Sequence, residues 1–160
     1  MRVATPVMLL YVAPVLAPAF LAWFFGHTLS SGRTPFIAQL VHIMHQGREP
    51  PEPAVWPYAR SLTRAWTLFF IALASINLTL ATLAEPHGLL LSAGVRPPFT
   101  VPQYGWSLFA NVIGYLAVAA FFVIEYAYRR RRFPQQPFRN LYDFLKQVAA
   151  VMPRLLRSRE

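Results

Sequence analysis

The sequence predicts an all-α, polytopic membrane protein with three transmembrane helices and amphipathic helices at the cytoplasmic interface. Of the 160 residues, 56% are hydrophobic and only 13% are charged, which is more apolar than is usual for a soluble domain. Three apolar stretches, residues 7–25, 63–83 and 106–128, are each long enough to cross about 30 Å of hydrocarbon. We expect residues 1–133 to form the transmembrane domain and residues 134–160 to form a basic amphipathic tail.

Charge and cysteine content exclude several function classes. The formal net charge is +9, but the basic residues gather after the third apolar stretch, which suits anionic lipid headgroups better than nucleic acid. The chain has no cysteine, so thiolate metal sites and cysteine nucleophiles are excluded. The sequence contains no Walker loop, nucleophile elbow or dinucleotide fingerprint, and we expect no catalytic residue, cofactor or metal.

The first apolar stretch and the connection that follows it each contain residues that predict local structure. Pro14 and Pro18 lie inside the first apolar stretch, so we expect a kinked helix there. Thr34 followed by Pro35 predicts the start of an amphipathic helix over residues 35–46, which would lie along the membrane surface. The proline-rich residues 49–53 then predict a stiff connector to the second span, with Trp56 and Tyr58 as interfacial anchors before that span.

The distribution of arginine predicts the orientation. Arg33, Arg48, Arg60 and Arg64 flank the first connection, and Arg129, Arg130, Arg131 and Arg132 directly follow the third span, whereas the loop over residues 85–105 carries Arg96 alone. The positive-inside rule therefore places the first connection and the C-terminus in the cytoplasm. The arginine run after the third span is predicted to contact lipid headgroups or a partner protein.

Four polar residues are candidates for a site at membrane depth: Arg64, Ser107, Asn111 and Glu125. In an antiparallel hairpin of the second and third spans, Arg64 falls level with Glu125, and Ser75 falls level with Gly114. Two interpretations remain open. The polar stripe could serve helix association, with Arg64 and Glu125 as an ion pair, or Glu125 could bind a proton or a cationic headgroup in a polar cleft.

Several segments of the chain resemble a family of uncharacterised bacterial inner-membrane proteins associated with aryl-polyene or xanthomonadin-type pigment and related fatty-acid-like biosynthetic clusters. The segments are Phe25-Gly26-His27-Thr28-Leu29, Gly32-Arg33-Thr34-Pro35, Tyr58-Ala59-Arg60, Trp66, Trp106-Ser107-Leu108-Phe109-Ala110-Asn111, Glu125-Tyr126, Arg129 and Phe133. A ketosynthase label sometimes accompanies such proteins, but the absence of cysteine argues against that activity here.

The resemblance implies a role in making or delivering polyketide-like acyl products at the bacterial inner membrane. Our leading expectation is an accessory protein, without catalytic activity, that docks acyl-chain enzymes or their acyl carrier protein at the membrane. A homo-oligomer is a further expectation. One alternative is a component of a transporter or flippase for a lipid-like product, with Asn111 and Glu125 lining the path. A weaker alternative is a membrane-bound transferase.

Overall fold

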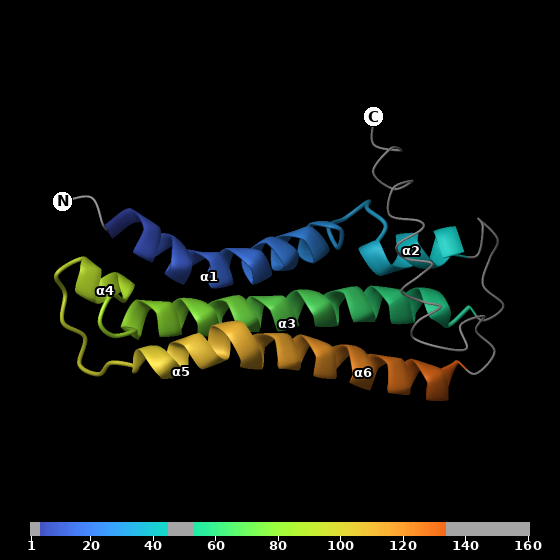
Figure 1. Ribbon diagram of the computed structural model, residues 1–160. Coiled ribbons are helices and arrows are strands. Elements are labelled where there is room, and N and C mark those ends of the chain that lie inside the picture. Colours follow the sequence, from blue (N-terminus) through green and yellow to red (C-terminus); the bar gives the residue numbers. More distant parts are fainter. Residues whose placement is uncertain (1–3, 45–52, 134–160) are drawn as a thin grey trace.

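Three long helical segments lie side by side in the computed structural model, which describes residues 4–44 and 53–133 (Figure 1). The elements, in chain order, are α1 (Ala4–His27), α2 (Phe36–Met44), α3 (Val55–Leu83), α4 (Leu89–Ser92), α5 (Gln103–Leu108), a π-helical turn η1 (Phe109–Ile113) and α6 (Gly114–Arg132). Figure 1 shows α3 between α1 and the α5–α6 segment. The all-helical prediction is confirmed for the described residues.

Helix α1 bends along its length, as Figure 1 shows, and contains both Pro14 and Pro18. Each proline removes one backbone donor from the helix, which is a sufficient cause for the bend. It packs tightly against α3 at Gly26, where an added Cβ would lie 3.1 Å from the Cγ2 atom of Thr67. A glycine at this position therefore lets the two backbones pack closely.

Helix α3 begins at Val55, eight residues before the start of the predicted span at residue 63. Pro57 is compatible with this earlier start because the amides of a first helical turn have no partner within the helix. Five hydroxyl side chains along α3 bond to the carbonyl one turn earlier, as in Thr67 to Thr63 and Ser75 to Ile71. Because these groups are satisfied within their own helix, α3 can carry them on an apolar surface.

Helix α2 starts one residue after Pro35, in agreement with the predicted helix over residues 35–46. Its first amides are bound by hydroxyls from elsewhere in the fold: the Phe36 amide donates to Thr28 Oγ1 at 3.0 Å, and the Ile37 amide donates to Thr63 Oγ1 at 3.4 Å. These bonds fix the N-terminal end of α2 against α1 and α3. Residues 45–52 and the predicted tail over residues 134–160 lie outside the described residues.

The change Thr63→Val should loosen α2 while leaving the helix bundle folded. Thr63 is buried and donates its hydroxyl to the Ala59 carbonyl while accepting from the Ile37 amide. Valine keeps the shape but removes both bonds, so we expect a loss of stability of about 1–2 kcal/mol. Hydrogen exchange measured by mass spectrometry should accelerate at the start of α2, whereas Thr79→Val, at an exposed position on α3, should leave α2 unchanged.

The loop between α3 and α5 closes the hairpin through backbone contacts. The Glu85 amide donates to the Val101 carbonyl at 2.9 Å, and the Val101 amide donates to the Leu83 carbonyl at 2.8 Å. Gly88 approaches this closure so tightly that an added Cβ would lie 2.3 Å from the Ala84 carbonyl oxygen. The loop thus sets where α5 begins relative to the end of α3.

The antiparallel pairing of α3 with the α5–α6 segment lies close to the predicted register. Gly114, expected to lie level with Ser75, faces Leu73, whose Cδ1 atom would lie 3.7 Å from an added Cβ. Trp66 packs against Phe121 with a ring-centroid distance of 4.4 Å. The observed pairing therefore differs from the predicted one by about two residues, or roughly 3 Å along the helix axis.

Two helices in the described part of the chain are long and apolar enough to cross a membrane, Val55–Leu83 and the continuous segment Gln103–Arg132. The part of α1 whose side chains are described is also apolar but shorter, Tyr11–His27. Two of the three predicted spans therefore meet the requirement of length and composition. A crossing by α1 stays a prediction.

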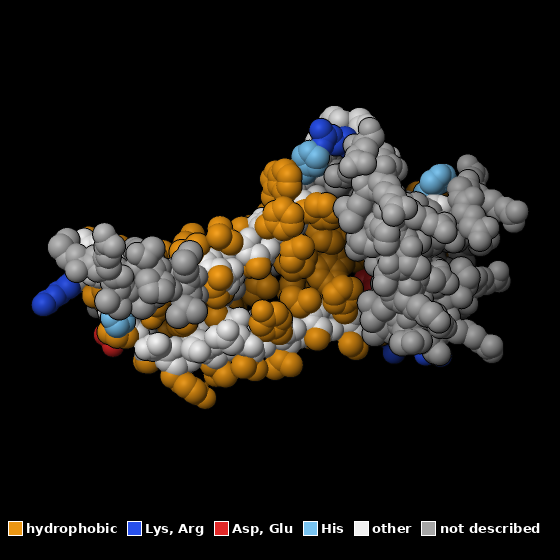
Figure 2. All heavy atoms as spheres, turned by 45° about the horizontal axis from the view of Figure 1, so that its top comes forward, with side chains coloured by type: hydrophobic (Ala, Val, Ile, Leu, Met, Phe, Trp, Pro, Cys, Tyr) orange, Lys and Arg blue, Asp and Glu red, His pale blue; other side chains and the backbone are white. Residues whose placement is uncertain are grey.

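Large apolar side chains cover much of the surface of this bundle, as Figure 2 shows for one face. Examples from the three long segments are Trp23 at 60% exposure, Leu68 at 66% and Ile124 at 67%. In the α5–α6 segment, Trp106 and Gly114 are the residues that are buried. An apolar surface of this kind needs an apolar solvent or protein partners.

Candidate functional site

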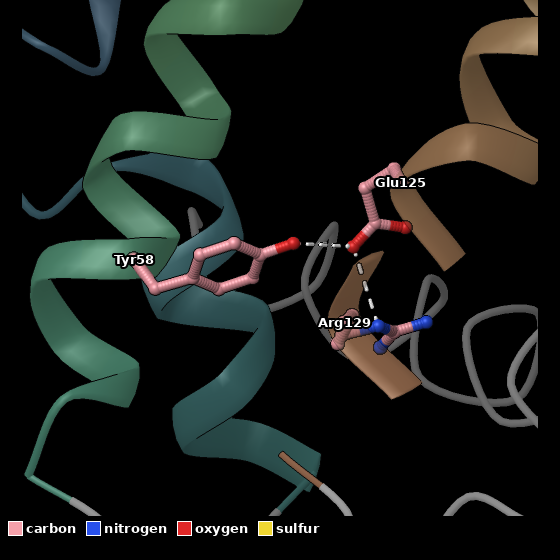
Figure 3. A network of polar contacts seen from close by, with 3 residues as sticks. All are labelled: Tyr58, Glu125 and Arg129. Carbon is pink, nitrogen blue, oxygen red and sulfur yellow. Dashed lines mark hydrogen bonds and ion pairs between the residues drawn. The ribbon is translucent and has the colours of Figure 1, made fainter. Parts of the chain in front are cut away.

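A polar network joins the first turns of α3 to the last turns of α6 (Figure 3). The Tyr58 hydroxyl donates to Glu125 Oε1 at 3.1 Å, and Arg129 Nε forms an ion pair with the same oxygen at 3.2 Å. The Glu125 side chain is only 10% exposed and that of Arg129 is 14% exposed. The carboxylate is thus shielded and already has two donors at one oxygen.

Aromatic rings hold the tyrosine of this network in place. The Tyr58 ring stacks on Tyr128, with centroids 5.9 Å apart, and meets the edge of Phe133 at 5.2 Å. Phe133 is buried, and its amide caps α6 by donating to the Arg129 carbonyl at 2.8 Å. These contacts fix the direction of the Tyr58 hydroxyl toward Glu125.

The predicted ion pair between Arg64 and Glu125 is wrong: Glu125 contacts Tyr58 and Arg129, and Arg64 is exposed on α3. Arg64 is six residues beyond Tyr58, which turns it about 120° away around the helix. Two side chains at equal depth in the hairpin therefore make contact only if they also face each other around their helices. Tyr58 was expected only as an interfacial anchor, although it shares a face of α3 with Leu62, Phe69 and Leu73 at helical spacing.

The structure does not bring Ser107 and Asn111 to Glu125 either. Asn111 is exposed and donates from Nδ2 to the Ser107 carbonyl at 2.9 Å and to Ser107 Oγ at 3.3 Å. The physical cause is η1, which contains Asn111: a π-helical turn holds more residues than an α-helical turn and so changes the direction of the side chains within it and before it. Gly114 and Glu125 face α3, whereas Asn111 does not. Asn77 likewise bonds within its own helix, where its Nδ2 donates to the Leu73 carbonyl at 2.9 Å.

One end of the bundle collects the basic side chains. Figure 1 places α2, the start of α3 and the end of α6 together at this end. We call it the basic end, and its described arginines are Arg33, Arg60, Arg129, Arg130, Arg131 and Arg132. Arg130, Arg131 and Arg132 are exposed, whereas the Arg129 side chain is mostly buried where it pairs with Glu125. Three cations of the predicted run are thus exposed, and Arg132 among them lies 5.8 Å from the centre of the Phe133 ring.

Within residues 4–44 and 53–133, no group of three or more His, Asp or Glu side chains is placed to hold a metal ion. His27 lies against Arg33 and Trp23, and His42 lies near Trp56. Among the described residues, the candidate sites are therefore the Tyr58–Glu125–Arg129 network and the arginines of the basic end.

Comparison of the chain with models of protein families, with curated proteins and with solved structures finds no match to any of them. The fold and the site define a class only: an α-helical protein with two helices long and apolar enough to span a membrane. Its function has to be argued from its own residues.

Proposed function

We propose that the chain is a multi-pass protein of the bacterial inner membrane, spanned by α1, α3 and the α5–α6 segment. The exposed apolar side chains on all three segments support this, because exposing them to lipid carries no free-energy penalty, whereas exposing them to water does. The basic end faces the cytoplasm under the positive-inside rule. Helix α2 lies at this end, but it runs beside the first turns of α3, with Ile37 at Thr63 and His42 near Trp56 (Figure 1), so it does not lie flat along the membrane surface as the sequence predicted.

In this membrane the protein acts as an accessory, without catalytic activity, that docks acyl-chain enzymes or their acyl carrier protein. The gathering of exposed arginines at the basic end is the observation that supports this proposal. Acyl carrier proteins are acidic, so a cationic surface next to the membrane complements them and speeds their encounter. The docked carrier would hold its acyl chain close to the lipid.

The other two functions find less support in the geometry. A flippase or transporter path through Glu125 needs an accessible carboxylate, but this carboxylate is shielded and paired with Tyr58 and Arg129. A transferase that used Glu125 or His42 as a base would need a nucleophile and an orienting group nearby, and His42 contacts Trp56. We therefore assign Glu125 a structural role.

A binding measurement tests the docking proposal. The purified chain is placed in nanodiscs of phosphatidylcholine, and its affinity for an acidic acyl carrier protein is measured at low salt. The triple change Arg130→Gln, Arg131→Gln and Arg132→Gln should weaken binding at least tenfold, since each lost contact removes roughly 0.5–1 kcal/mol. Arg129 is kept because it pairs with Glu125.

The matched control is Arg96→Gln, which removes a cation from the loop at the opposite end of the bundle. It should leave the affinity unchanged. Equal affinity of the triple variant and the original chain, or no binding of the carrier to either, would reject docking through the arginine run.

A further inference from the structure

Asn111 exposes an amide on the α5–α6 segment, which is long and apolar enough to cross a membrane. The predicted third span begins at Trp106, and Asn111 lies five residues beyond it. In the proposed membrane Asn111 therefore sits roughly 8 Å inside the hydrocarbon boundary. Lipid tails offer no hydrogen-bond partner at that depth, and an exposed amide there is costly. The exposed position of Asn111 therefore calls for a protein partner that supplies polar groups.

Asn111 and Ser107 use only part of their capacity to form hydrogen bonds. Asn111 Nδ2 donates to the Ser107 carbonyl and to Ser107 Oγ. Among the described residues, no group donates to Asn111 Oδ1, and no acceptor is seen for the hydrogen of the Ser107 hydroxyl. Each chain thus presents one free acceptor and one free donor, a helical turn apart.

We propose that two copies of this chain pair in the membrane through the α5–α6 face that carries Asn111. A two-fold axis along the membrane normal brings the same residues of both copies to the same depth. The Ser107 hydroxyl of one copy can then donate to Asn111 Oδ1 of the other, and the reverse bond follows by symmetry. A second copy is the partner that supplies the missing donor and acceptor at the required depth without further assumptions.

The remaining side chains of this face suit helix pairing. Tyr104, at 76% exposure, precedes Asn111 by about two turns, and Tyr115, at 72% exposure, follows it by about one turn. Each combines a large apolar ring with a hydroxyl, a combination enriched where proteins meet. A single asparagine between apolar layers also fixes the register of paired helices. The inference rests on the proposed membrane insertion, because in water the amide would be solvated.

The absence of cysteine allows a direct test by cross-linking. The single variant Tyr104→Cys is reconstituted in liposomes at a low protein-to-lipid ratio and oxidised. We expect a disulfide-linked dimer at a yield at least five times that of Thr79→Cys, a matched exposed position on α3. Adding Asn111→Leu to Tyr104→Cys should lower the dimer yield at least fivefold.

The control for that second change is Ser75→Leu, which replaces an exposed polar residue on α3 and should leave the yield of Tyr104→Cys unchanged. Equal yields from Tyr104→Cys and Thr79→Cys, or no effect of Asn111→Leu, would reject the dimer. Single-step photobleaching of the labelled original chain would also reject it, whereas two steps support it. Resistance to alkaline extraction is measured in parallel, so failure of membrane insertion is distinguished from failure to pair.

Discussion

The change Glu125→Leu should lower the free energy of unfolding by about 3 kcal/mol. Leucine fills the space but leaves the Arg129 guanidinium and the Tyr58 hydroxyl facing an apolar side chain in a shielded position. Removing one partner of a buried ion pair is costly because the other charge stays desolvated. The measurement is thermal unfolding in mild detergent, followed by circular dichroism.

Two further variants separate the parts of this network. Glu125→Gln keeps an oxygen for the Tyr58 hydroxyl and should cost about half as much, while Tyr58→Phe should cost about 1 kcal/mol. The double variant Glu125→Leu with Tyr58→Phe should lose less stability than the sum of the two single changes, because they share one interaction. Unchanged stability of Glu125→Leu together with loss of a transported product would instead favour the transporter.

The change Trp66→Ala should cost about 3–5 kcal/mol. Trp66 is 4% exposed and packs against Phe25 of α1, Phe70 of its own helix, and Phe121 of α6, at centroid distances of 6.2, 5.4 and 4.4 Å. Trp66 therefore links α3 to both α1 and α6. Its removal leaves a cavity that the neighbouring rings can fill only in part.

Trp23→Ala is the matched control, because Trp23 lies on α1 at 60% exposure. It removes the same side chain from a surface position and should change the stability by less than about 0.5–1 kcal/mol. Thermal unfolding of both variants in the same detergent gives the comparison. Equal losses from the two tryptophans would contradict the packing described for Trp66.

Much of the helix arrangement could be predicted from the sequence, because long apolar stretches and the position of Pro35 determine where helices form. The stretches over residues 7–25, 63–83 and 106–128 all lie in helices, and the α3 hairpin register is correct to about two residues. The start of α3 was placed too late because Trp56 and Tyr58 were interpreted as anchors outside the helix. A proline in the first turn does not interrupt a helix.

The candidate site was harder to predict because it depends on rotation around each helix. Val118, Phe121 and Glu125 recur at helical spacing and face α3, as does Gly114. Asn111 was expected on the same face, but the π-helical turn rotates it away, and no residue pattern in the sequence marks that turn. Tyr58 could have been found by following the spacing on α3 back from Leu62 to its first turn.

The most direct test of the account is a map of which positions lie on which side of the membrane. Single cysteines at Thr5, Thr34 and Val95 are exposed to a membrane-impermeant maleimide in intact spheroplasts. The account predicts labelling of Thr5→Cys and Val95→Cys from outside, and labelling of Thr34→Cys only after permeabilisation. Labelling of Thr34→Cys and Val95→Cys from the same side, or release of the protein by alkaline extraction, would contradict the three-span membrane protein.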